Sequence, residues 1–238
     1  VTVSGGTIGG TNAADANKTT GTEINEGMGG GIYMAPRCTL NMLNNVQVIG
    51  NTARNGGGVY AFGTTVTLTN CTLKGNTAKS GGAIYAKKSG SNVSSVTITG
   101  GTIGGTNPTD ANKATGTGTD NGMGGAIYIG DTCSLNLKDS TDPSSGVQRL
   151  RILGNRAQKG TGIYAKNTIV SMKDTLQIDT NNDVYLDDGT KIRADNDLNP
   201  PSGFVARITV PDDKYNTSTQ VLIANHGVNL ANQTGKFT

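Results

Sequence analysis

The sequence predicts an all-β protein folded as a right-handed parallel β-helix. One motif, Gly-Gly-aliphatic-Tyr, returns along the 238 residues, and apolar residues alternate with polar ones between its copies, as in strands. The 36 glycines, together with abundant Thr and Asn, favour strands joined by turns. Each repeat can bury its apolar side only against its neighbours, so we expect about six or seven stacked three-sided coils with a C-terminal β cap.

The tyrosine motif marks the repeat. It reads GGAIYA at residues 81–86 and returns as GGGIYM, GGGVYA, GGAIYI, GTGIYA and NNDVYL. Successive tyrosines are 27, 25, 43, 36 and 21 residues apart, which predicts loops inserted into some of the coils. Residues 1–34 also recur at 96–129 with a constant offset of 95, and a nine-residue insertion follows near the segment DSTDPSSG. The chain is therefore a duplicated block of several coils.

Alternating apolar positions of successive repeats align into five columns. We expect the side chains in these columns, such as Leu68, Leu73 and Ile84, to point inward. The columns are Val1, Leu40, Val66, Val96, Leu135 and Val170; Val3, Met42, Leu68, Ile98, Leu137 and Met172; Ile8, Val48, Leu73, Ile103, Ile152 and Ile178; Ile32, Val59, Ile84, Ile127, Ile163 and Val184; and Met34, Ala61, Ala86, Ile129, Ala165 and Leu186. We expect residues 1–194 to form the β-helix and residues 195–238 to add capping strands to the same domain, because an open end would leave backbone groups unpaired.

Asparagines are expected to point inward at the corner after the third column. An amide side chain there can bond the backbone of neighbouring coils and tolerates the geometry of a turn. The expected residues are Asn51, Asn76, Asn155 and Asn181.

The repeats resemble those of the chlamydial polymorphic membrane proteins and similar surface proteins of spirochaetes and other bacteria. GGAI stands at residues 81–84 and 124–127. The FxxN-type tetrapeptide of that family corresponds to residues 48–51, 73–76 and 152–155, with an aliphatic residue in place of Phe. The resemblance covers roughly residues 1–186. It implies a β-helical passenger region exported to the bacterial cell surface for adhesion or host contact, with no catalytic residues to carry over.

We therefore expect a non-catalytic adhesin-type fragment whose partner is a host protein, a glycan or a neighbouring surface protein. A net charge of +3, with 20 basic and 17 acidic residues, argues against nucleic acid, and no apolar run is long enough to span a bilayer. The chain begins within the repeat pattern, so we expect a piece of a longer protein, either monomeric or associating end to end. Two alternatives remain: a polysaccharide lyase or hydrolase on the same fold, and a self-assembling structural protein of the cell surface.

Ligand binding is expected on the outer side of the tyrosine strands. The neighbours of each tyrosine fall in apolar columns, so the rings must point outward, where small flanking residues would leave the ring faces accessible. The alternative is that the rings stack only to shield the backbone, or that residues 195–238 fold over them. The six residues are Tyr33, Tyr60, Tyr85, Tyr128, Tyr164 and Tyr185.

Two duplicated loops, residues 11–22 and 106–117, offer oxygen donors of the kind that calcium binds. Each loop has one carboxylate among these donors, which favours a solvated loop over a calcium site; no other cofactor is expected. The candidate ligands are Asn12, Asp15, Asn17, Asn107, Asp110 and Asn112.

The three cysteines are expected to be free, small and buried. Cys38 and Cys133 share a position three coils apart, roughly 14 Å at the strand spacing, whereas the Cα atoms of bridged cysteines lie within about 7 Å. Cys71 falls on a different side of the coil. The single histidine, His226, has no second metal-ligating residue near it in sequence.

Overall fold

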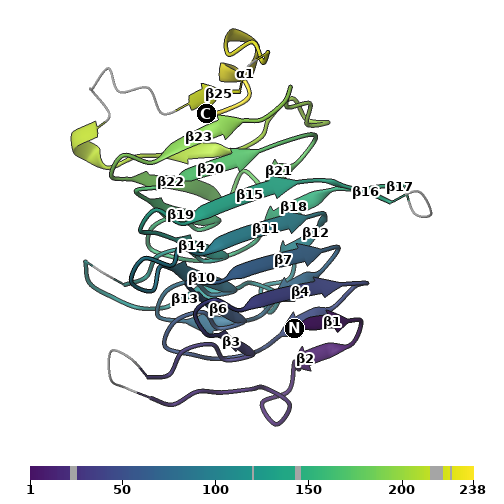
Figure 1. The fold of residues 1–238 in the computed structure, drawn as a ribbon, viewed down its shortest axis with the longest axis vertical. Coiled ribbons are helices and arrows are strands. Elements are labelled where there is room, and N and C mark those ends of the chain that lie inside the picture. The colour runs from purple at the N-terminus through teal and green to yellow at the C-terminus, as the bar shows by residue number, and fades with distance from the viewer. Residues whose placement is uncertain (22–25, 120, 143–145, 215–221, 226) are drawn as a thin grey trace.

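The computed structural model describes residues 1–21, 26–119, 121–142, 146–214, 222–225 and 227–238. Strands make up 45% and helices 3%, so the protein is nearly all-β (Figure 1). Three long sheets of eight, seven and six strands account for most of it, and every pairing within them is parallel. None of the helices in the described residues has the length and apolarity needed to cross a bilayer.

In all three sheets the strands pair in the order in which they follow one another along the chain. The eight-stranded sheet contains β1 (Thr2–Ser4), β4 (Thr39–Leu43), β7 (Thr65–Thr69), β11 (Ser95–Thr99), β15 (Ser134–Lys138), β20 (Ile169–Met172), β23 (Lys191–Ala194) and β25 (Leu222–Ala224). The seven-stranded sheet contains β3 (Ile32–Met34), β6 (Val59–Phe62), β10 (Ile84–Lys87), β14 (Ile127–Ile129), β19 (Ile163–Lys166), β22 (Asp183–Asp187) and β24 (Arg207–Thr209). The six-stranded sheet contains β2 (Thr7–Gly9), β5 (Gln47–Ile49), β8 (Thr72–Lys74), β12 (Gly101–Gly104), β18 (Leu150–Leu153) and β21 (Gln177–Ile178).

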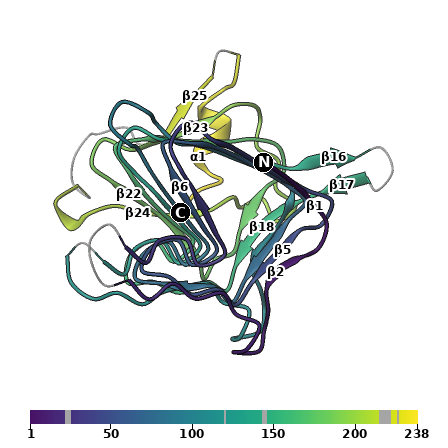
Figure 2. The ribbon, with the colours of Figure 1, turned by 60° about the horizontal axis from the view of Figure 1, so that its bottom comes forward.

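The chain visits the three sheets in rotation and returns to each sheet one strand further along. We call one such passage a coil. Viewed toward one end, strands of successive coils lie behind one another around a common interior, which is consistent with a parallel β-helix (Figure 2). A narrow two-stranded sheet of β9 (Thr77–Ala78) and β13 (Lys113–Ala114) adds a further side at one corner. The predicted insertion forms the antiparallel hairpin of β16 (Ser140–Asp142) and β17 (Gly146–Gln148), which projects from the body.

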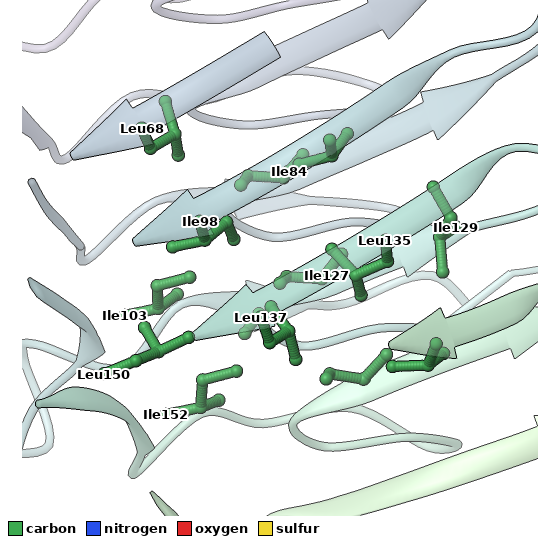
Figure 3. Packing of buried hydrophobic residues seen from close by; sticks show 14 of the residues in the cluster. Leu68, Ile84, Ile98, Ile103, Ile127, Ile129, Leu135, Leu137, Leu150 and Ile152 are labelled. Carbon is green, nitrogen blue, oxygen red and sulfur yellow. The ribbon is translucent and has the colours of Figure 1, made fainter. Parts of the chain in front are cut away.

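The predicted apolar columns form the interior except at the first coil, where Val1 is 77% exposed and Val3, Ile8 and Ile32 are only partly buried. Leu68 pairs with Met42 on one side and Ile98 on the other, so each residue of a column lies directly above the next. Leu68, Leu73 and Ile84 are all at most 1% exposed, which confirms the predicted inward direction. Figure 3 shows Leu68, Ile84 and Ile98 among the side chains that fill this interior. Each buried aliphatic side chain contributes roughly 1.5–3 kcal/mol, so the stack is stable where a single coil is not.

The two glycines of GGAIYA, Gly81 and Gly82, meet different structural requirements. Gly81 has a φ of +64°, in the left-handed region that glycine adopts without a steric penalty. Gly82 lies against the next coil: a Cβ added there would lie 2.3 Å from the carbonyl oxygen of Gly125. One glycine therefore allows the turn, and the other allows adjacent coils to approach.

The C-terminal segment adds β24 to the seven-stranded sheet beside β22, and β25 to the eight-stranded sheet beside β23. It also contains a 3-10 turn, η1 (Asp212–Lys214), and one short helix, α1 (Ala231–Thr234), which the repeat pattern does not predict. The helix is held by Gln233, which is fully buried and accepts a hydrogen bond from the backbone N of Leu198 at 3.0 Å. The same side chain donates to Asp197 at 2.8 Å.

Candidate functional site

The six predicted tyrosines form one continuous stack on the outer side of the seven-stranded sheet. Each pairs in register with the tyrosine of the next coil. Their ring centroids are 5.6, 5.4, 4.3, 5.2 and 5.5 Å apart, with interplanar angles of at most 16°. The rings therefore point away from the main core and lie face over face, as the alternation predicts.

The predicted accessibility of these rings is wrong for half of the stack. Tyr60 is 0% exposed, Tyr164 2% and Tyr185 8%, whereas Tyr85 and Tyr128 are partly buried and Tyr33, at 49%, is exposed. The glycine turn that precedes each strand lies against its tyrosine side: a Cβ added at Gly81 would lie 2.7 Å from the Cβ of Tyr85. The backbone returns beside the rings and covers them, so the small flanking residues bring neighbouring chain close rather than leaving the rings open.

A thioether and an ammonium group complete the cover at the C-terminal end of the stack. Met123 packs with Tyr164 and Tyr185 in a second hydrophobic cluster, separate from the main core. The Nζ atom of Lys159 lies 5.4 Å from the centroid of the Tyr185 ring, at cation–π distance. Burial raises the pKa of Tyr60, Tyr85 and Tyr164 well above the ordinary value of 10.0. The stack is thus largely a second core: Tyr33 is its most exposed ring, and Tyr85 and Tyr128 are partly exposed.

Asparagines form a second continuous array, the asparagine ladder, inside the corner after the six-stranded sheet. From Asn17 to Asn155, each side-chain amide nitrogen donates to the side-chain oxygen of the asparagine in the next coil, at 2.8–3.0 Å. The backbone nitrogen of each asparagine donates to the same oxygen, at 3.0–3.3 Å. The members are Asn17, Asn51, Asn76, Asn112, Asn155 and Asn182.

The ladder corrects three sequence predictions. Asn181 is exposed and its neighbour Asn182 takes the inward position, because this corner is one residue longer than those at Asn51 and Asn76. Asn17 and Asn112, predicted as calcium ligands, use their side chains in the ladder instead. The signal for Asn112 was present in the sequence, since NKA at 112–114 matches NTA at 51–53 and 76–78.

The remaining donors of the duplicated loops form two small matching turns. The side-chain amide of Asn12 donates to the carboxylate of Asp15 at 3.1 Å, and that of Asn107 donates to Asp110 at 3.3 Å. Asp110 also forms an ion pair with Lys74 at 3.0 Å. Calcium binding at these loops stays a prediction, now confined to one carboxylate and one amide in each. In the described residues, no group of three or more His, Cys, Asp and Glu side chains is placed to hold a metal ion.

Two adjoining hollows, which we call the corner groove, lie beside the second loop. The first, of about 410 Å³, is lined by Thr106, Asn107, Arg156, Thr161 and Asn181 among others. The second, of about 300 Å³, is lined by Lys113, Thr115, Arg156 and Gln158 among others. Arg156 is exposed and lines both hollows. Sequence reasoning missed Arg156, because a lone arginine in the repeat NRAQKG carries no motif.

The groove offers hydrogen-bond donors and acceptors rather than a reacting pair. Its hydroxyl, amide, ammonium and guanidinium groups suit the recognition of sugars or anions. The carboxylates close to it are already engaged. Asp110 is paired with Lys74, and Asp183 is buried and accepts hydrogen bonds from the backbone N and hydroxyl of Thr161 at 2.7 and 2.6 Å.

The cysteines are all free. Cys71 and Cys133 are buried, and burial raises the pKa of both thiols. Cys38 is exposed, which corrects the prediction that all three are buried. At the equivalent position, Cys133 is covered by Ser94, whose backbone N donates to the Cys133 sulfur at 3.3 Å. His226 lies outside the described residues.

A comparison of the chain with protein-family models, with curated proteins and with solved structures finds no match.

Proposed function

We propose that this chain is a non-catalytic ligand-binding region of a bacterial surface protein and mediates adhesion or display. The observation that carries the proposal is the corner groove. Its lining of hydroxyl, amide and cationic side chains around Arg156 provides contacts for a polar ligand, while the carboxylates beside it hold structural bonds. The continuous tyrosine stack and asparagine ladder supply a rigid support for such a surface.

We also propose the complete architecture. The parallel register and the rotation of the chain through three sheets support a right-handed parallel β-helix of about six or seven three-sided coils. The pairing of β24 and β25 with the last strands supports a capping role for residues 195–238 within the same domain. The GGAI and FxxN-type repeats support membership of the polymorphic-membrane-protein-like surface proteins, and with it an extracellular location and a host protein or glycan as partner.

The proposed function is tested by screening the labelled protein on an array of glycans and matrix proteins. The variant Arg156→Gln removes the charge at the centre of the groove, and Tyr33→Ser removes the one exposed ring of the stack. Binding that is lost with Arg156→Gln and retained with Tyr33→Ser supports the groove. A ligand that both variants bind as well as the parent protein contradicts it. Turnover of any array polysaccharide, followed as new reducing or unsaturated ends, would favour the enzyme alternative.

End-to-end association is a second candidate function, favoured by the N-terminal end. Strands β1, β2 and β3 each pair with only one neighbour among the described residues, and in the proposed association their other edges pair with strands of a second copy. The Tyr33 ring at this end has one neighbouring ring and is 49% exposed. Sedimentation velocity over a range of concentrations tests this candidate. Association that Tyr33→Asp abolishes would support it, and a monomer at every concentration would contradict it.

A further inference from the structure

Cationic side chains line up along one corner of the stack. Lys113 pairs with Arg156 of the next coil and with Thr77 of the preceding one, and Thr77 connects through Thr52 to Lys18. These positions share the outward direction, since the alternate positions Ala78 and Ala114 are buried. Lys79, two residues after Thr77 and exposed, lies on the same side. We call Lys18, Lys79, Lys113 and Arg156 the basic strip.

The strip is long and narrow. From Lys18 to Arg156 it runs over four coil spacings, roughly 19 Å at the separation of parallel strands. Lys79 lies about 7 Å to the side of this row, because it is two residues further along its strand than Thr77. Outward threonines, such as Thr52 and Thr77, lie between the cations. The two hollows of the corner groove flank its C-terminal part, with Arg156 lining both and Lys113 lining one. Charges, hydroxyl groups and hollows thus follow the long axis of the protein.

Among the described residues, no carboxylate is seen in an ion pair with a cation of the strip. The ion pairs join Lys74 to Asp110 and Arg193 to Asp195, and neither includes one of the four cations. Lys159 is close by, but its ammonium group lies over the Tyr185 ring and is already engaged there. Arg54 adjoins the strip but has interactions of its own. Its backbone N donates to the carbonyl oxygen of Gly27, the residue after Glu26. The proposal therefore rests on the other four cations.

We propose that the basic strip binds a linear anionic polysaccharide that lies along the axis of the stack. This inference rests on the proposed binding function and names its ligand class. A rigid row of cations matches the repeated carboxylate or sulfate groups of such a chain, and the threonine hydroxyls can bond the sugar oxygens between them. A single small anion would use one or two of these cations and leave the others without a partner.

The surroundings of the strip favour a polysaccharide over a nucleic acid or a membrane. Proteins that bind single-stranded nucleic acid stack the bases on exposed aromatic side chains. In the described part of the chain, the exposed large hydrophobic residues are Val1, Tyr33, Val93 and Ile169, and none belongs to the strip. The strip therefore lacks both a stacking platform for bases and apolar side chains that would enter a lipid surface.

The test measures binding to heparin, as a sulfated polysaccharide, and to uncharged dextran. The double variant Lys113→Gln with Arg156→Gln removes two charges of the strip. Lys138→Gln with Lys173→Gln removes two exposed charges elsewhere and is the matched control. Each cation removed near a dense anionic surface should weaken binding about fivefold, so we expect the Lys113 and Arg156 double variant to bind heparin about 25-fold more weakly. The control double variant should change heparin binding less than about twofold. Raising the salt concentration should weaken parent binding more than that of the first pair, because the parent neutralises more charges.

The opposite results overturn the inference. Equal losses of heparin affinity in the two double variants would mean that heparin responds to the net charge of the protein. Binding of dextran as tight as that of heparin would mean that the protein does not recognise the charge of the polysaccharide. Preference for polyuridylic acid or for phosphatidylserine vesicles would assign the strip to a nucleic acid or a membrane. If the parent protein does not bind heparin but binds a neutral glycan or a protein on the array, and Arg156→Gln abolishes that binding, the binding function stands and this inference alone fails. Thermal unfolding of each variant, expected to be unchanged at these surface positions, controls for misfolding.

Discussion

Replacing Asn112 by Ala is expected to destabilise the protein by roughly 3–5 kcal/mol. The Asn112 side chain is fully buried and forms four hydrogen bonds. Its oxygen accepts from the backbone N and the side-chain nitrogen of Asn76, at 3.1 and 2.9 Å, and its nitrogen donates to Leu73 and Asn155, both at 2.9 Å. Alanine leaves the two donor groups of Asn76 and the Leu73 carbonyl without this partner, whereas Asn155 keeps a bond from the backbone N of residue 112. Each buried polar group left unpaired costs about 1–3 kcal/mol, and partial relaxation lowers the sum.

The matched control is Asn107→Ala, five residues earlier in the same loop. Asn107 is exposed, and its side chain forms one hydrogen bond, to Asp110 at 3.3 Å. We expect a change below about 0.5 kcal/mol for this variant. Urea unfolding followed by circular dichroism measures both, and the Asn112→Ala midpoint should fall by about 1–2 M at a slope of about 2–3 kcal/mol per M. Equal stabilities of the two variants would refute the structural role of the ladder.

Three further predictions concern other parts of the chain. Burial raises the pKa of Tyr60 and Tyr164, so their contribution to stability is complete below the ordinary pKa of 10.0 and is lost as the pH rises above it. Tyrosinate absorbance should therefore appear together with cooperative unfolding in an alkaline titration. Titration of these two phenols in a fully folded protein would contradict this prediction. A thiol reagent should modify one cysteine, Cys38, in the native protein and three in denaturant, whereas one free thiol in denaturant would indicate a disulfide. Gly82→Ala should destabilise by roughly 2–4 kcal/mol through its clash with the next coil, against less than about 0.5 kcal/mol for the unobstructed Gly235→Ala, and comparable melting temperatures would contradict the close approach.

The sequence predicts the interior well because the alternation of apolar and polar residues records which side chains point inward. Leu68, Leu73 and Ile84 are buried as expected, and the register of neighbouring coils follows from aligning the tyrosine motifs. A one-residue slip would turn every apolar residue of a strand outward, so the pattern permits a single alignment.

The outer surface is harder to predict from the same pattern. Alternation shows that Tyr60 points away from the main core, but not that a glycine turn returns beside it and buries it. Asn112 stands in a polar loop sequence, and only its match to the N-x-A corners indicates that it is buried. The basic strip is assembled from residues up to 138 positions apart, Lys18 and Arg156. Its members come together through the pairing of coils, which no local motif records.

The proposed site of recognition is tested most directly by comparing ligand binding of Arg156→Gln and Tyr33→Ser on the same glycan and matrix-protein array. Because recognition is placed at the corner groove and the tyrosine stack is a second core, the ligand of the parent protein should be lost with Arg156→Gln and kept with Tyr33→Ser. Loss of binding with Tyr33→Ser alone, in a variant that unfolds at the parent temperature, would place recognition on the tyrosine stack and contradict the proposed site.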